Sequence, residues 1–252
     1  MTLQACADIV QRGDPDRFAA AMVAPVDARR VLFPLYAFNV EVARAPWVTE
    51  EPMIAEMRLQ WWRDALEEIA KGKKVRKHEV TTPLADVLHA PLAETLDRLV
   101  QARRWDIYRD AFDDTDHFDH YLKMTGGLLM WTCAHVLGAG INTTDRIFAL
   151  GKATALVRFL KAVPALEKRG RIPLVDGRPE KIAALATTAL ENLPNMQHLK
   201  AAVPKPARGA LIEAWETQAL LHQIARNPSR VAAGAIGLSE FRKRARLARW
   251  AL

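Results

Sequence analysis

The chain has 252 residues, of which 50% are hydrophobic and 26% charged, the balance of a globular protein rather than a disordered one. It contains only 12 glycines and is rich in alanine, a composition that favours helices and argues against an all-β sandwich or a glycine-rich nucleotide-binding fold. Lys and Arg number 36 against 29 for Asp and Glu, so the net charge is +7, which suits an anionic partner, either a membrane surface or nucleic acid.

Hydrophobic residues recur with helical spacing along nearly the whole chain. The segments predicted to be helical are, in chain order, 27–42, 50–70, 117–137, 144–163, 179–192, 206–225 and 239–250. Pro164 is expected to end the helix that begins at residue 144, because proline removes a backbone donor and clashes with the preceding turn. No stretch alternates for long enough to indicate a strand. We therefore expect an all-α protein of about ten helices, in a single domain over residues 1–252.

The helix predicted over residues 50–70 has an apolar stripe that is expected to face the core. Its members are Met53, Met57, Trp61, Ala65 and Ile69. The acidic string at residues 113–119 precedes another predicted helix. Its carboxylates are expected to cap free N–H groups there, although clustered carboxylates also suit Mg²⁺ or Ca²⁺.

The C-terminal segment reads as a basic amphipathic helix. One stripe of it is apolar and consists of Phe241, Ala245, Ala248 and Leu252. Basic residues crowd the rest of the helix: Arg242, Lys243, Arg244, Arg246 and Arg249. Such a helix can lie on anionic lipid or dock on an acidic partner, so these basic residues are a candidate membrane or partner surface. The alternative is an ordinary terminal helix that packs on its own domain.

Several features bear on location. The N-terminus lacks the layout of a signal peptide, and no apolar stretch is long enough to span a bilayer. Cys6 and Cys133 lack metal-ligand spacing, so free thiols in a reducing compartment are expected. The basic run at 71–77 has no interleaved aromatic residues, so no nucleic-acid partner is expected. We therefore expect a cytoplasmic protein that associates peripherally with a membrane.

Five short strings carry a more specific signal. In chain order they are Asp16-Arg17-Phe18-Ala19-Ala20, Leu35-Tyr36-Ala37-Phe38-Asn39, Trp62-Arg63-Asp64-Ala65-Leu66, Gly151-Lys152-Ala153 and Arg169-Gly170-Arg171. In order and spacing they resemble the squalene/phytoene synthase family over nearly the whole chain. The resemblance implies the all-α isoprenoid (terpenoid) synthase fold with a central cavity. Enzymes of that family join two prenyl diphosphates head to head, and carboxylates on two facing helices hold the Mg²⁺ that ionises the diphosphate.

The chain departs from the family at those carboxylates. The positions that correspond to them are Ala43, Arg44, Trp47, Ala162 and Leu166. Both acidic motifs are therefore lost, so no catalytic residue, metal or cofactor is expected. In this respect the chain is similar to the non-catalytic branch of the family, the phytoene-synthase-like assembly factors of respiratory complex I.

The resemblance also implies where a ligand would bind in the vestigial cavity. The candidate ligand-binding residues are Tyr36, Asn39, Arg44, Arg63, Arg158, Lys161 and Arg171. Arg44 and Lys161 are expected to face one cavity and give it a cationic mouth. Such a mouth should bind phosphate, sulfate or a lipid head group without metal.

The resemblance thus predicts a non-catalytic protein that assists assembly of complex I, the NADH:quinone oxidoreductase, at the membrane. Its expected partners are complex I subunits or assembly intermediates and an anionic membrane surface. Two alternatives remain open. The first is a head-to-head prenyl transferase that uses Mg²⁺, and the second is a non-catalytic binder of an isoprenoid or another lipid.

Overall fold

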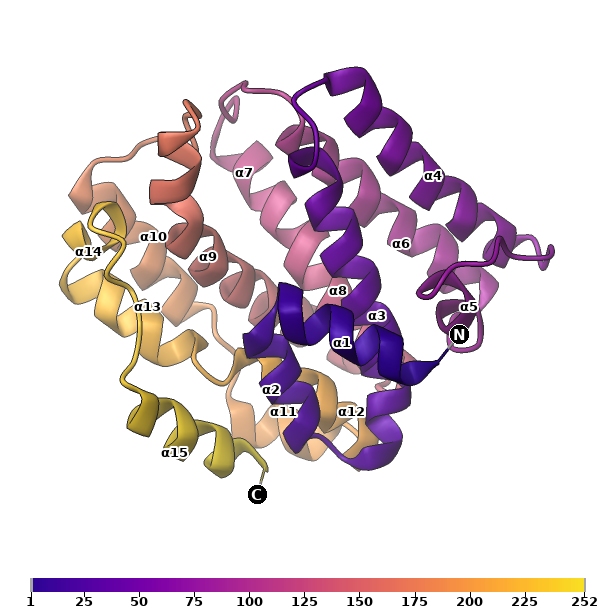
Figure 1. Cartoon of the computed structure of the whole chain (residues 1–252). Helices are drawn as coiled ribbons and strands as arrows, with labels where there is room; N and C mark the ends of the chain where they lie inside the picture. The colour runs from indigo at the N-terminus through magenta and orange to yellow at the C-terminus, as the bar shows by residue number, and fades with distance from the viewer. Residues whose placement is uncertain (1, 252) are drawn as a thin grey trace.

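The computed structural model describes residues 2–251, and every regular element in that range is helical (Figure 1). The α-helices are α1 (Leu3–Gly13), α2 (Pro15–Val23), α3 (Val26–Arg44), α4 (Pro52–Ala70), α5 (Thr81–Ala85), α6 (Ala90–Ala102), α7 (Thr115–Leu122), α8 (Leu128–Val136), α9 (Thr144–Lys168), α10 (Pro179–Glu191), α11 (Met196–Ala202), α12 (Lys205–Leu211), α13 (Thr217–Arg226), α14 (Ser229–Ala232) and α15 (Glu240–Ala251). Short 3-10 turns are η1 (Ala45–Trp47), η2 (Arg103–Asp106), η4 (Ile141–Thr143) and η5 (Ile212–Ala214), and η3 (Lys123–Gly127) is a π-helical turn that joins α7 to α8. The all-α prediction is confirmed.

The helices surround two hydrophobic cores. The larger core is centred on α3, whose buried side chains include Leu32, Leu35 and Phe38. Side chains from α1, α4, α6, α8 and α12 pack around α3 and complete this core. The smaller core surrounds α9, where Leu156 and Leu160 pack against α7, α10 and α13. Figure 1 shows these two groups of helices on opposite sides of the molecule.

Small residues let α9 approach the π-helical turn closely. A Cβ atom built on Gly151 would lie only 2.8 Å from the Cα atom of Gly127 and 2.9 Å from the carbonyl oxygen of Gly126. The glycines therefore set the distance between α9 and the α7–α8 segment. This distance fixes the position of the α9 face that lines the central cavity.

The prediction that Pro164 ends the helix is wrong, because α9 continues through Pro164 to Lys168. The stop signal is Gly170, which has a φ of +74° and follows the last helical turn. The N–H groups of Gly170 and Arg171 donate back to the carbonyl oxygens of Glu167 and Leu166, which is a Schellman-type ending. The helix tolerates the loss of the one backbone hydrogen bond that Pro164 cannot donate.

The face of α4 that was predicted to be buried is only partly so. Met53 and Met57 are 75% and 67% exposed, and Trp62 rather than Trp61 enters the core. Trp61 is half-buried and lies beneath the guanidinium of Arg76, whose Cζ atom is 5.0 Å from the ring centroid. Adjacent stripes of this helix are both apolar enough to be buried, and the stripe that is buried contains Trp62, whose ring packs edge-on against Phe38 of α3 with the centroids 5.6 Å apart.

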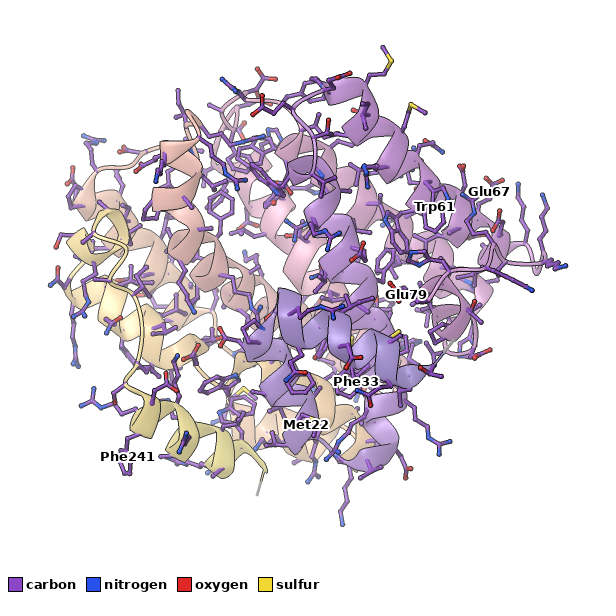
Figure 2. The ribbon with its side chains drawn as sticks, viewed as in Figure 1. Met22, Phe33, Trp61, Glu67, Glu79 and Phe241 are labelled. Atoms are coloured by element: carbon purple, nitrogen blue, oxygen red, sulfur yellow. The ribbon has the colours of Figure 1, made fainter. Side chains whose placement is uncertain are left out.

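The helix α15 is rotated relative to the prediction. Leu247 and Trp250 pack against the larger core, whereas Phe241 is 81% exposed and points away from the molecule (Figure 2). Ala245 and Ala248 are exposed as well, so the predicted apolar stripe is wrong for the described residues. Its last member, Leu252, lies outside them. The helix thus packs on its own protein through one edge and presents its basic residues on the rest.

Of the remaining predictions, one is confirmed and others are wrong. The acidic string caps α7 as predicted, since the Asp114 carboxylate accepts from the N–H of His117 at 2.7 Å. The segment predicted as one helix over 206–225 is instead α12, η5 and α13. The sequence reading also missed α1, α2 and α6, which contribute to the larger core. Within residues 2–251 no helix combines the length and the apolar character needed to cross a bilayer.

Candidate functional site

A cavity of about 430 Å³ lies between α2, η1, η2, α7 and α9. Its lining residues are Arg17, Trp47, Arg103, Asp106, Tyr121, Leu122, Thr125, Gly126, Ala155, Arg158, Phe159, Ala162, Ala165, Leu166 and Arg169. Apolar side chains form most of the wall, and guanidinium groups supply most of its charge. The cavity is therefore suited to a ligand with an apolar part and an anionic part.

Asp14 organises one wall of the cavity. It is the N-cap of α2, where its side chain accepts from the backbone N–H of Arg17 at 3.0 Å, and Pro15 begins the helix. Its other oxygen binds the guanidinium groups of Arg17 at 2.8 Å and Arg158 at 2.5 Å. Burial alone would raise the pKa of Asp14, but these two cations prevail and lower it from 3.8 to about 2.

Arg17 also reaches into the larger core. Its Nε donates to the buried Glu213 carboxylate at 2.5 Å, and its guanidinium lies over the ring of Tyr36 at 5.6 Å. Tyr36 and Asn39 are both buried, and neither lines the cavity. The Tyr36 hydroxyl and the Asn39 Oδ1 have no hydrogen-bond partner among the described residues. Burial raises the pKa of the Tyr36 hydroxyl well above its ordinary value, so it stays protonated.

A second polar group stands on the wall formed by η2 and α7. The Asp106 carboxylate accepts from the Tyr121 hydroxyl at 3.0 Å and from Arg103 at 3.1 Å, and Arg103 also donates to the Tyr121 hydroxyl at 2.8 Å. Burial raises the pKa of Tyr121. Buried Arg103 Nε has no acceptor among the described residues. This wall therefore keeps an N–H donor without a protein partner.

Two cations cover Trp47, which lies in η1 and lines the cavity. The guanidinium carbons of Arg169 and Arg171 lie 4.7 Å and 4.8 Å from the centroid of its ring. Arg171 also donates to the backbone carbonyl oxygens of Trp105 and Asp106, which ties the segment after α9 to η2. The Trp47 ring thus makes cation–π contacts with two guanidinium groups at the wall of the cavity.

The charge of the cavity is positive. Four guanidinium groups line it, from Arg17, Arg103, Arg158 and Arg169, against the single carboxylate of Asp106. Even when Asp14 and Glu213 behind the wall are included, four cations stand against three carboxylates. Among residues 2–251, no three His, Cys, Asp or Glu side chains are grouped so that they could hold a metal ion. The arrangement can bind an anion through charge-assisted hydrogen bonds.

The structure brings together only some of the residues predicted for this site. Arg158 lines the cavity, and Arg171 lies at its edge over Trp47. Arg44 does not line it: its side chain is 63% exposed and lies 3.6 Å from Glu41. Lys161 also points elsewhere and lies 3.3 Å from Asp16 on α2. The expectation that Arg44 and Lys161 face one cavity is therefore corrected, because α3 and α9 turn these two positions away from it.

Arg63 has a structural place instead. It donates from two nitrogens to the Asp97 carboxylate at 2.8 and 3.1 Å, which joins α4 to α6 away from the cavity. The sequence reading missed Arg17, Arg103 and Arg169 as cavity residues. Arg17 and Arg169 stood inside the strings that carried the family resemblance, so position in those strings was a usable signal. Arg103 follows a helix that was not predicted, and nothing marked it.

The fold and the cavity define a class, the all-helical proteins with an isoprenoid synthase fold. Two solved structures share the arrangement. A dehydrosqualene synthase in complex with ligand has a TM-score of 0.78 at 14% identity, covering 98% of this chain and 94% of that chain. A squalene synthase from Alicyclobacillus acidocaldarius has a TM-score of 0.71 at 15% identity, covering 90% of this chain and 94% of that chain. The predicted fold is confirmed by these likenesses.

The chain belongs to the squalene/phytoene synthase family, whose sequence profile matches residues 10–176. Its curated relatives include the NADH dehydrogenase (ubiquinone) complex I, assembly factor 6 homolog of Drosophila melanogaster, which is 26% identical over 88% of this chain and 75% of that protein. Complex I assembly factor 6 of Mus musculus and of Homo sapiens are 25% and 23% identical over 66% of this chain. The matched region spans about half the length of these two mammalian proteins, at 51% of each.

Proposed function

We propose that this protein is a non-catalytic member of the squalene/phytoene synthase family that assists the assembly of respiratory complex I. The curated relatives named above support the assembly role. One observation at the site supports the non-catalytic part: four guanidinium groups line the cavity, against the single carboxylate of Asp106. Trp47, Ala162 and Leu166 line the cavity at three motif positions, and none can ligate Mg²⁺.

The prenyl transferase alternative has less support from the geometry. Ionising a prenyl diphosphate needs a metal to neutralise the leaving oxygens. Asp106, the one carboxylate in the lining, already accepts hydrogen bonds from Tyr121 and Arg103. A metal at Asp106 would also be close to the Arg103 guanidinium, which repels it. The family's cavity would then act as a binding site rather than as a catalytic one.

The positive cavity supports a ligand with an anionic head and an apolar body, the isoprenoid or lipid binder considered above. Arg103 lines the cavity there, and the Arg158 guanidinium is held at the wall by Asp14. Phe159 and Leu166 supply apolar surface beside them. Inorganic pyrophosphate is the simplest probe of the anionic half. Pyrophosphate should bind in the presence of EDTA. The double variant Arg103→Gln/Arg158→Gln should bind it about tenfold more weakly, or weaker still.

The proposal includes peripheral association with a membrane. Arg244 and Arg249 are exposed on α15, whereas Leu247 and Trp250 of the same helix pack against the larger core. Lys243 contributes less, because it turns to Glu240 at 2.9 Å. Each basic residue close to an anionic leaflet adds roughly 1 kcal/mol of attraction, which salt screens. Sedimentation with anionic vesicles at low salt and release at high salt is the expected behaviour.

The assembly role is tested in cells that encode this protein. Deleting its gene should reduce fully assembled complex I on blue-native gels, and the intact chain should restore it. A pull-down from native membranes with mass spectrometry should recover complex I subunits or assembly intermediates. Normal amounts of assembled complex I in the deletion strain would contradict the proposal.

A further inference from the structure

A second charged concavity lies on the surface, between α13–α14 and α15. This groove has a volume of about 610 Å³. Four arginines line it: Arg226 and Arg230 from the α13–α14 side, and Arg242 and Arg246 from α15. Phe241 lies at its α15 side and is 81% exposed. Figure 1 shows α15 at the edge of the molecule, beside the loop that leads from α14.

The groove differs from the central cavity in how its arginines are paired. In the cavity, Asp14, Asp106 and Glu213 bind the guanidinium groups. No Asp or Glu lines the groove, and within residues 2–251 none of its four arginines makes an ion pair. Four positive charges thus stand together with no compensating carboxylate, which is a surface complementary to an anion.

Hydrogen bonds between side chains and backbone groups hold the walls of the groove in place. Gln223 on α13 binds Gly237 twice, donating to its carbonyl oxygen at 3.1 Å and accepting from its N–H at 3.0 Å. Arg230 Nε donates to the carbonyl oxygen of Ala235 at 3.0 Å. These bonds fix the link between α14 and α15, so the two walls keep their spacing without a ligand. A preorganised site loses less entropy on binding.

We propose that this groove binds an acidic peptide segment of a partner protein. Guanidinium groups on both walls can bind carboxylates through paired N–H donors, and clusters of arginine recognise acidic segments in this way. Exposed Phe241 offers an apolar contact to a neighbouring side chain of such a segment. A flat bilayer fits a concave surface poorly, and the α15 arginines outside the groove, Arg244 and Arg249, remain for lipid. The inference deepens the proposed function, on which it rests for the identity of the partner.

The test compares two double variants of the full chain. Arg226→Gln with Arg242→Gln removes one charge from each wall, and both side chains are exposed. Arg244→Gln with Arg249→Gln removes the same charge from exposed positions outside the groove. The probe is a fluorescein-labelled peptide of glutamates and phenylalanines, with glutamine in place of glutamate in a control peptide. Anisotropy is measured at about 50 mM salt, where the Debye length still exceeds 10 Å. Thermal unfolding of each variant checks the fold.

The acidic peptide should bind the intact chain and the outer variant with similar affinity, and bind the groove variant about tenfold more weakly. The glutamine peptide should not bind. Equal weakening in both variants would overturn the inference, because the attraction would then be diffuse. Vesicles with and without phosphatidylserine form a second arm. Loss of vesicle binding in the groove variant with unchanged peptide binding would show that the groove takes a lipid head group, and would overturn it as well. These measurements use purified protein, so their failure is distinct from a failure to affect complex I.

Discussion

Substitution of Asp14 is the most direct single-residue test of the ion pairs at the wall of the central cavity. The carboxylate of Asp14 binds Arg17 and Arg158, and its side chain is 13% exposed. Replacing it in Asp14→Asn removes the negative charge but keeps a good N-cap for α2, because asparagine caps helices as well as aspartate does. The variant therefore isolates the ion pairs from the cap. Asp14→Ala removes both and should cost about 1 kcal/mol more.

The expected magnitude follows from the pKa of Asp14. The native carboxyl has a pKa of about 2, against an ordinary value of 3.8, and each unit corresponds to about 1.4 kcal/mol. A depressed pKa stabilises the folded state above the unfolded pKa, and this contribution is lost as the pH falls through the native pKa. Asp14→Asn should therefore lower the free energy of unfolding by about 2 kcal/mol at pH 7. The deficit should shrink between about pH 4 and pH 2.

Urea unfolding of both proteins at several pH values between 7 and 3 measures this difference. Inorganic pyrophosphate binding should be kept or strengthened in Asp14→Asn, because Arg158 loses its carboxylate partner and the cavity becomes more positive. Arg158→Gln is the opposite control and should weaken that binding. A loss of stability below about 0.5 kcal/mol, or a deficit that does not change down to pH 3, would refute the role given to Asp14.

Three further predictions concern other parts of the chain. Gly151→Ala should lower the free energy of unfolding by more than about 2 kcal/mol in urea, because the new Cβ meets backbone atoms at 2.8 and 2.9 Å, whereas Gly177→Ala meets nothing within 4 Å and serves as its control. Burial, with a smaller effect of Glu79, raises the pKa of Cys6 to about 12, so a thiol reagent at pH 8 should label this cysteine only after unfolding; labelling of the folded protein would contradict its burial. Arg63→Gln should cost less than about 1 kcal/mol and leave pyrophosphate binding unchanged, and a clear loss of binding would place Arg63 in the site after all.

The helical periodicity of the sequence predicted the fold class, and most long helices were placed within a few residues. The periodicity gave the wrong buried face for two helices, in which more than one face is apolar and tertiary packing determines which face is buried. On α4, Trp61 and Trp62 are equally apolar, and it is Trp62 that is buried, against Phe38 of α3. On α15, Leu247 and Trp250 pack inward, although Phe241 is the more conspicuous apolar residue. The hydrophobic pattern of one helix carries no information about where a neighbouring helix will pack.

The site was predicted in kind rather than in detail. The sequence predicted an apolar cavity with a cationic mouth formed by Arg44 and Lys161, whereas the four guanidinium groups of the observed cavity come from Arg17, Arg103, Arg158 and Arg169. The residues differ, because a shift of one or two positions on a helix turns a side chain from the cavity to the surface. Arg44 and Lys161 were turned outward in this way, and only Arg158 of the predicted cations lines the cavity.

The non-catalytic character of the cavity is the central claim, and ³¹P NMR tests it most directly. Purified protein is incubated with farnesyl or geranylgeranyl diphosphate and excess Mg²⁺, with an active dehydrosqualene synthase as the positive control. The account predicts that no inorganic diphosphate is released beyond the rate without protein, although the substrate binds equally well in EDTA. Diphosphate release that depends on Mg²⁺ and is lost in Arg103→Gln with Arg158→Gln would contradict it, and would identify the cavity as the active site of a prenyl transferase.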